Sequence, residues 1–351
     1  MTKVSLLLAA LALSAPVLGH PETPEAIRDA LETRSRVTAY SRRTLDQCAG
    51  SPAAQALKER AIARRAATAD ALREQRGLKT SKQRRDKASW ERLVGVSHDM
   101  TPQGYDLNTP PDTLFASNAT CALVPETIIG PYWVEGELIR TDLTDGQRGV
   151  PVHVDFQFID IHTCKAVPNL LIDFWHANAT GVYSGVTAPG QGGLNTTHGR
   201  GVQLSDDDGV VQFDTLFPGH YIDRTNHFHI MTTGGATALP NGTFQGGRTQ
   251  HIGQVYFDSA LIQSVEAQEP YASNTQPVTS NLEDSLGLDE ATPEYDPFMK
   301  YVHLGDHVSD GLLMWLTVGI DPAADYNKNR TAAAHWGAGG GTDLTNGSSQ
   351  A

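Results

Sequence analysis

A two-residue alternation of apolar and polar side chains runs through residues 152–158 and directs this chain toward a β-rich fold. Val152, Val154, Phe156 and Phe158 are separated by polar residues, so an extended strand places the four apolar side chains on one face. The run Asp206-Asp207-Asp208-Gly209 is typical of a tight turn between strands. We predict a mainly β fold, with an antiparallel β-sandwich core and an N-terminal helical segment.

Residues 20–97 have a different composition and predict helix. Ser51 can cap a helix that begins at Pro52, and Gly77 supplies a stop. This region carries 17 Lys and Arg against 10 Asp and Glu, whereas residues 98–351 carry 9 against 30. A basic stretch can indicate nucleic-acid binding, but here the basic residues are interleaved with acids and alanines. We predict no nucleic-acid partner, and either an arm that docks on the acidic core or a homodimer contact.

Residues 1–19 have the pattern of a secretory signal peptide. Lys3 supplies the positive start, and an apolar run extends from Val4 to Leu13. The run is too short to span a bilayer, so we expect a secreted, extracellular protein without a membrane partner. Six Asn-x-Ser/Thr sequences predict a glycoprotein. They are Asn118, Asn178, Asn195, Asn241, Asn329 and Asn346.

Three cysteines suit a chain that forms one disulfide in an oxidising compartment. Cys121 and Cys164 bracket the first strands of the expected core and are the predicted pair. Cys48 would then be either free or paired between chains. Residues 98–323 are predicted as the sandwich domain, and the polar segment 324–351 as a disordered tail.

Two histidines and two tyrosines form a candidate metal site. His227 and His229 share one face of an extended strand, with Phe228 on the other. A tyrosine has an ordinary pKa near ~10, but a strongly charged metal removes that proton and binds the phenolate. Phenolates from Tyr183 and Tyr221, with two neutral imidazoles, would leave an iron(III) ion with one net positive charge.

Five ordered segments within about residues 125–260 resemble the intradiol ring-cleavage dioxygenases of the catechol and protocatechuate type. Thr225 and Asn226 stand where that family has Pro-Ala, and Phe228 stands where it has Ile between the two histidines. These departures bear on substrate choice more than on the metal site. The segments are Ile129 through Trp133, Trp175 through Tyr183, Pro218 through Tyr221, Arg224 through His229, and Gly253 through Phe257.

The resemblance implies a non-haem Fe(3+) centre held by Tyr183, Tyr221, His227 and His229. It also implies an enzyme that uses O2 to cleave a catechol-type ring between its two hydroxylated carbons, giving muconate-type diacids. Tyr221 follows the flexible Pro218-Gly219 turn, so it is predicted to leave the metal and act as a base when catechol binds. Tyr183 is predicted to stay bound.

The remaining predicted site residues would contact the substrate. By resemblance, Arg224 would stabilise charge that develops on the ring, and Gln254 would lie beside it. Tyr132 and Trp133 would line the pocket, whereas Trp175 and His176 are interpreted as core residues. The strongly acidic core disfavours anionic substrates at long range, so neutral catechols or hydroxyquinols fit better than aromatic acids.

Two alternatives from other classes remain open at the level of sequence. In the first, the chain is a non-catalytic β-sandwich that binds a ligand, and the Tyr and His residues are structural. In the second, His227 and His229 hold copper or zinc, together with His20. Analysis of the metal in the purified protein distinguishes all three interpretations.

Overall fold

A computed structural model describes residues 50–78, 120–121, 129–284, 286–287 and 297–345, and helical positions among residues 32–48. The predicted signal peptide, Asn118, Asn346 and the end of the basic region lie outside the described residues. Among the helices that are described, none has the length and apolarity needed to cross a membrane.

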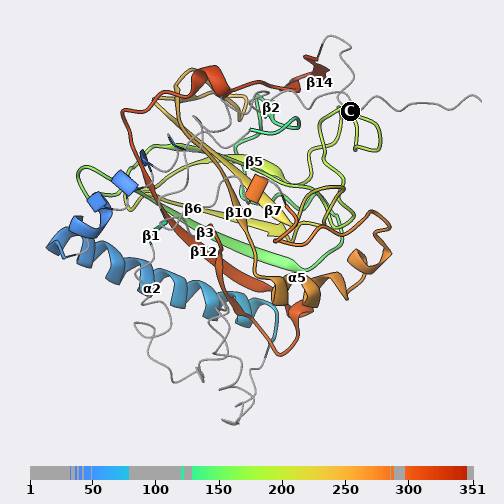
Figure 1. The fold of residues 1–351 in the computed structure, drawn as a ribbon, viewed down its shortest axis with the longest axis horizontal. Helices are drawn as coiled ribbons and strands as arrows, with labels where there is room; N and C mark the ends of the chain where they lie inside the picture. Colours follow the sequence, from blue (N-terminus) through green and yellow to red (C-terminus); the bar gives the residue numbers. More distant parts are fainter. Residues whose placement is uncertain are drawn as a thin grey trace, which may run out of the picture.

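Two main sheets form the molecule (Figure 1). The first contains β1 (Thr120–Cys121), β12 (Leu312–Ile320), β3 (Pro151–Asp160) and β6 (Val210–Leu216), with β11 (Lys300–His303) also paired to β12. The second contains β10 (Arg248–Tyr256), β7 (His227–Gly234), β4 (Leu171–Trp175) and β5 (Arg200–Leu204). The second sheet is antiparallel throughout, as predicted.

The first sheet is mixed rather than purely antiparallel. β12 runs parallel to both β3 and β1, whereas β3 pairs with β6 in the antiparallel sense. Parallel neighbours need a long connection, and β3 and β12 are separated by more than half of the described chain.

Shorter elements complete the fold. β2 (Val134–Glu135), β13 (Ala334–Gly337) and β14 (Gly340–Asp343) form a small sheet, and β8 (Thr237–Ala238) pairs with β9 (Phe244–Gln245). The helices are α2 (Pro52–Gln75) and α5 (Ser259–Glu266), with 3-10 turns η1 (Tyr271–Ser273), η2 (Val308–Asp310) and η3 (Asn327–Asn329).

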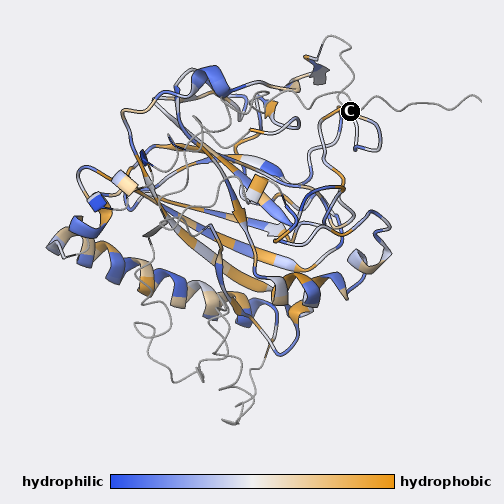
Figure 2. Ribbon diagram, in the orientation of Figure 1, coloured by the Kyte–Doolittle hydropathy of each residue, from blue (hydrophilic) through white to orange (hydrophobic). Residues whose placement is uncertain are grey.

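The main hydrophobic core fills the space between the two sheets. The predicted apolar face of β3, Val152 through Phe158, packs with Phe174 of β4 and Phe228 of β7. Hydrophobic residues recur along the central strands in Figure 2. The burial of Phe228 confirms the predicted alternation in β7 and turns His227 and His229 toward the outer face of the second sheet.

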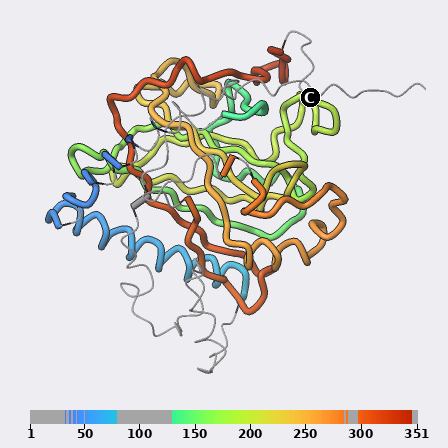
Figure 3. The backbone as a smooth tube through the Cα atoms, viewed as in Figure 1, coloured from blue at the N-terminus to red at the C-terminus, as the bar shows by residue number. Residues whose placement is uncertain are grey.

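The polar face of β3 is also buried, because α2 covers it. Apolar residues Ile62 and Leu72 of α2 pack with Leu313 and Trp315 of β12, and Figure 3 shows α2 running beside this sheet. The predicted start holds: the Ser51 hydroxyl accepts a hydrogen bond from the Ala54 N–H, and Pro52 is the first helical residue. The basic region is therefore an arm that docks on its own core, at least over α2, while a homodimer contact stays a prediction.

Buried charge fixes α2 on the sheet. Asp155 of β3 is fully buried and accepts hydrogen bonds from Arg64 at 2.8 Å and from Arg65 at 2.9 Å. The two guanidinium groups outweigh burial and lower the Asp155 pKa to about 2. A second pair, Arg60 with Asp208, lies on the surface at 2.9 Å.

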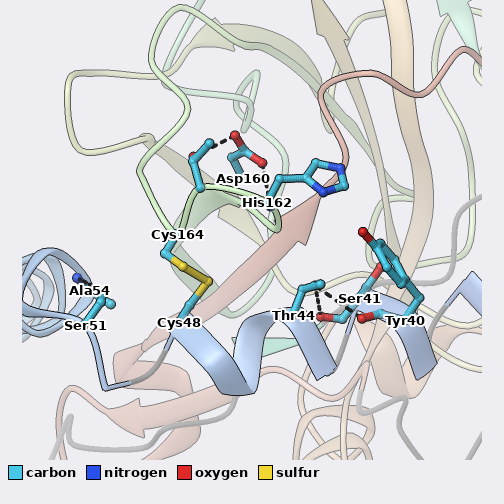
Figure 4. The surroundings of a disulfide bond; sticks show 10 residues. Tyr40, Ser41, Thr44, Cys48, Ser51, Ala54, Asp160, His162 and Cys164 are labelled. Carbon is cyan, nitrogen blue, oxygen red and sulfur yellow. Dashed lines mark hydrogen bonds between the residues drawn. A yellow bond between two sulfur atoms is a disulfide. The ribbon is translucent and has the colours of Figure 1, made fainter.

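The disulfide differs from the predicted one. Cys48 bonds to Cys164 across 116 positions, with their Cα atoms 5.2 Å apart (Figure 4). Cys164 follows the end of β3 in a turn with positive φ, and the docked N-terminal arm brings Cys48 beside it. The predicted Cys121–Cys164 pair is therefore wrong, because the position of the arm could not be read from strand order.

The predicted disordered tail is wrong over residues 324–345. β13 pairs with both β14 and β2, and Ala333 and Ala334 are buried in a cluster with Trp133. Backbone pairing with a distant strand stabilises this polar segment, although it has few apolar side chains of its own. Residues 346–351 lie outside the described residues.

We predict that Asp155→Asn lowers the free energy of unfolding by about 3 kcal/mol, because two buried guanidinium groups lose their carboxylate. In the wild type, the carboxylate pKa is lower in the folded state than its unfolded value near ~3.9, so its contribution is present above that pH. It is lost as pH falls from about 4 to about 2.

Denaturant unfolding at pH 7 and pH 3 measures both effects. Asp208→Asn removes the same charge from the exposed pair and should change stability little at either pH. Equal effects of the two substitutions would contradict the role given to Asp155.

Candidate metal centre

The register of the strands places three side chains of the site side by side on neighbouring strands of the second sheet. His229 of β7 lies opposite Trp175 of β4 on one side and Gln254 of β10 on the other. His227 lies one pleat further, opposite Tyr256. All three strands are bonded by their backbones, so the histidine side of the site is built on a rigid surface, whereas Tyr183 and Tyr221 come from loops outside these strands.

The four predicted metal ligands converge. The His227 and His229 Nε2 atoms are 3.1 Å apart. The Tyr183 hydroxyl lies 3.1 Å from His229 Nε2, 3.5 Å from His227 Nε2 and 3.4 Å from the Tyr221 hydroxyl. The Tyr221 hydroxyl lies 3.2 Å from His227 Nε2. Four residues from three separate segments therefore direct their donor atoms toward a common point.

Both imidazoles are held in the neutral form and oriented from behind. Burial lowers the pKa of His227 and of His229 well below the usual value, and in each case a neighbouring positive group adds to the effect. His227 Nδ1 is 2.6 Å from the Thr225 carbonyl oxygen. Because a carbonyl only accepts, Nδ1 carries the proton and the Nε2 lone pair faces the cluster. Trp175 stacks on His229 at 4.8 Å, which confirms its interpretation as a core residue.

The two tyrosines differ in how firmly they are held. Tyr183 is fully buried; its N–H donates to the Gln191 side chain at 2.6 Å, and its carbonyl accepts from Gly192 at 2.7 Å. Tyr221 is half-buried and is followed by two exposed residues, of which Asp223 has a positive φ. Burial raises the pKa of both phenols, so a bound cation must compensate for deprotonation.

Gly219 has a different purpose from the one predicted. Its φ is not in the left-handed region, but a Cβ at this position would collide with the carbonyl oxygen of Ala179. The glycine therefore lets the Tyr221 turn lie against the segment that carries Tyr183. The exposed residues that follow Tyr221, rather than a hinge at Gly219, are therefore the feature that would let this side chain move.

A buried cluster of charged side chains lies beside Tyr183. The Arg200 guanidinium lies 5.8 Å from the Tyr183 ring centroid, and its Nε donates to the Ser184 carbonyl at 2.9 Å. Arg200 pairs with the buried Glu137 at 3.5 Å. Burial raises the pKa of Glu137 to about 7, and it also raises the pKa of Asp173 well above its usual value. Sequence reasoning missed this cluster, since none of its members belongs to a spaced motif.

Arg224 and Gln254, both predicted to lie beside the substrate, contact each other next to the four candidate ligands. Arg224 donates to the Gln254 side-chain oxygen at 2.5 Å. It also pairs with Asp284 at 2.9 Å, an acid that the sequence did not single out. Asp284 lies in an acidic stretch between α5 and β11, and only composition marked that stretch.

Thr225 and Asn226, which stand where the resembled family has Pro-Ala, both have structural roles. The Thr225 N–H donates to Asp284 at 2.9 Å, which a proline could not do. The Asn226 amide donates to the Pro218 carbonyl at 2.7 Å and to Glu266 of α5 at 2.9 Å. These contacts fasten the start of β7 to the Tyr221 turn and to α5.

Of the two aromatic residues predicted to line a pocket, one lies beside the cluster. The half-buried Tyr132 has its ring 4.9 Å from that of Tyr183. Trp133 is 1 % exposed, and its indole N–H donates to Asp173 at 2.8 Å. Trp133 therefore packs in the buried region behind the four candidate ligands. These contacts do not support its predicted role in lining a pocket.

The donor set suits a single ion that accepts oxygen and nitrogen ligands. A tetrahedron around an ion bonded at ~2.0–2.1 Å has edges of roughly 3.3–3.4 Å, close to the separations of 3.1–3.5 Å between the donor atoms. No group of three or more His, Cys, Asp or Glu side chains in the described ranges could hold a metal. A metal bound here therefore needs the tyrosines.

Comparisons with known proteins agree with the motifs. Residues 128–259 match the model of a family described as Dioxygenase. An intradiol ring-cleavage dioxygenase from Tetranychus urticae is 27% identical, with a TM-score of 0.48, over 59% of this chain and 98% of its own.

Two further solved structures are similar. The dioxygenase domain of a dioxygenase carbohydrate-binding protein fusion from Streptomyces sp. SirexAA-E is 25% identical (TM-score 0.38; 57% of this chain, 98% of that one). Catechol 1,2-dioxygenase from Acinetobacter sp. ADP1 is 18% identical (TM-score 0.39; 63% and 69%). No match was found among curated proteins.

The family match spans all four candidate ligands and all five segments on which the resemblance was based. It also spans β4, β7 and β10, the three paired strands that carry Trp175, His229 and Gln254. Residues 128–259 of this chain thus match a dioxygenase family model, and the motifs within them resemble those of the intradiol ring-cleavage dioxygenases, which are oxygen-incorporating enzymes.

Proposed function

We propose that the protein is an extracellular, non-haem iron(III) dioxygenase that cleaves catechol-type rings between the two hydroxylated carbons. The observation that supports this most directly is the convergence of two phenol oxygens and two imidazole nitrogens, each of which lies 3.1–3.5 Å from at least two of the others. The products would be muconate-type diacids, and the co-substrate O2.

Iron(III) fits this donor set on chemical grounds. Phenolates are hard, anionic ligands, and the neutral imidazoles are oriented by partners behind them. Two phenolates reduce the charge of the centre to one net positive, which offsets part of the cost of burying it. When bound, iron(III) would withdraw electron density from a catechol and make the ring reactive toward dioxygen.

The protein's own groups would bind the substrate and move its protons. Tyr221, half-buried and next to an exposed turn, is suited to swing away and accept a catechol proton. Tyr183 is fixed by burial and by backbone contacts, which suits a ligand that remains in place. Arg224 and Gln254 would lie beside the ring, where the N–H groups of a fixed guanidinium and an amide can stabilise developing charge by hydrogen bonding.

Secretion is part of the proposal and rests on two features. The first is the signal-like segment at residues 1–19. The second is the Cys48–Cys164 disulfide, a bond that persists in oxidising compartments.

We predict that the purified wild type binds about one iron per chain and is coloured by phenolate-to-iron charge transfer. Tyr183→Phe should lose iron and colour both with and without catechol, because it removes the fixed ligand. Tyr221→Phe should keep part of the iron but slow turnover about 100-fold or more, because the internal base is gone.

Metal analysis and absorption spectra with and without catechol measure these effects. Tyr40→Phe, on an exposed helical tyrosine, is the matched control and should behave as wild type. A colourless wild type with full activity would disprove the iron assignment, and copper or zinc in its place would favour the alternative metals. Full turnover by Tyr221→Phe would reverse the two tyrosine roles.

The position of ring cleavage gives a separate prediction. Incubation of catechol with the enzyme and labelled O2 should yield a muconate diacid that has gained both oxygen atoms, as measured by mass spectrometry. The reason is that cleavage between the hydroxylated carbons leaves a carboxyl group on each. A yellow semialdehyde would instead indicate cleavage beside the hydroxyl groups and a different mechanism.

A further inference from the structure

Asp284 is a buried carboxylate in direct contact with the substrate-stabilising arginine. It is 0 % exposed. Its Oδ2 accepts hydrogen bonds from Arg224 Nε and from the Thr225 N–H, each at 2.9 Å. Its Oδ1 accepts from the Gly287 N–H, also at 2.9 Å. Three donors from two segments therefore fix the carboxylate in one orientation.

The Arg224 charge is consequently balanced before any substrate enters. Its side chain is 11% exposed, so the attraction between the two charges is screened far less than on the surface. The same guanidinium also donates to Gln254 at 2.5 Å and reaches the Tyr256 hydroxyl at 3.4 Å. The pair can still present N–H dipoles to a catechol ring, but it presents almost no net charge.

A substrate that carries its own carboxylate would be repelled by Asp284. It would have to share Arg224 with a buried carboxylate that is already bonded to it, and the repulsion between two anions in a water-poor site is strong. A neutral catechol has no such penalty. The core as a whole is acidic, with 9 basic against 30 acidic residues over 98–351, so the long-range field acts in the same direction.

One of the hydrogen bonds that hold Asp284 in place exists because this chain has Thr225 where the resembled family has proline. Thr225 supplies the N–H that holds Oδ2, and the proline of that motif has no N–H to give. A neighbouring contact, from the Thr225 hydroxyl to the Asn281 side chain at 2.8 Å, holds the acidic loop against the start of β7.

We propose that Asp284 is a specificity-determining residue that restricts the site to neutral catechols and rejects catechols with a ring carboxylate. This inference rests on the proposed function. It assigns to one residue a preference that net charge alone could only suggest.

The test compares two ligands that differ in charge and little in shape, 3,4-dihydroxybenzamide and 3,4-dihydroxybenzoate. Equilibrium binding to the iron-loaded protein without oxygen, measured by calorimetry, gives their affinity ratio, and kcat/KM for each gives a second ratio. The wild type should bind the amide at least about tenfold more tightly than the carboxylate. Asp284→Asn keeps the shape and removes the charge, and should shift the ratio toward the carboxylate by about tenfold or more.

Glu283→Gln is the matched control. It removes the adjacent acid, whose carboxylate accepts hydrogen bonds from Ser280 at 3.0 Å and 2.7 Å without contact to Arg224. It should leave the ratio unchanged, whereas an equal shift would indicate a general effect of net charge and overturn the proposal.

The wild-type ratio decides the matter even where Asp284→Asn does not fold. Equal binding of amide and carboxylate by a wild type that turns over catechol would overturn the role of Asp284 alone. An unchanged ratio in a folded Asp284→Asn would also overturn it. Absence of any catechol binding would instead overturn the proposed function and this inference together.

Discussion

Backbone pairing of β7 with β4 and β10 sets the geometry on which the rest of the site depends. Side chains alternate along a strand, so burial of Phe228 between the sheets turns both histidines to the opposite face. Register then places Trp175 and Gln254 on either side of His229. A shift of one residue in β7 would turn the imidazoles into the core between the sheets and Phe228 toward the candidate ligands. The hydrophobic core therefore keeps the candidate site together by fixing the register.

Buried charged side chains at three places in the structure each have a partner of opposite charge. Asp155 is matched by two arginines of α2, and Arg224 by Asp284. Arg200 lies between Glu137 and Tyr183. An isolated buried charge would cost too much free energy, so each of these charges is paired. Because the partners lie far apart in the sequence, each pair also holds two distant segments together. The helical arm and the acidic loop are both fastened in this way.

The two tyrosines differ in packing in the way that the proposed function requires of a fixed ligand and a movable one. Tyr183 lies in the interior, beneath Tyr132 and beside Arg200. Tyr221 occupies a turn whose next residues are in water. Both bring the same functional group to the same point, and the difference between them lies in packing. Their proposed roles follow from that difference, since a catalytic base must be able to leave the metal.

Sequence by itself determined the β architecture, the start of α2 and the four candidate ligands, because alternation, capping and short motifs are local properties. Resemblance to a known family, rather than any local property, placed Arg224 and Gln254 beside the expected substrate. Only the tertiary structure decided the Cys48–Cys164 bond, the ordered β13–β14 hairpin, the Arg200 cluster and the contact of Asp284 with Arg224. Each of these joins segments far apart in the chain, and their partners are set by how the sheets, the arm and the loops pack, which no local pattern encodes.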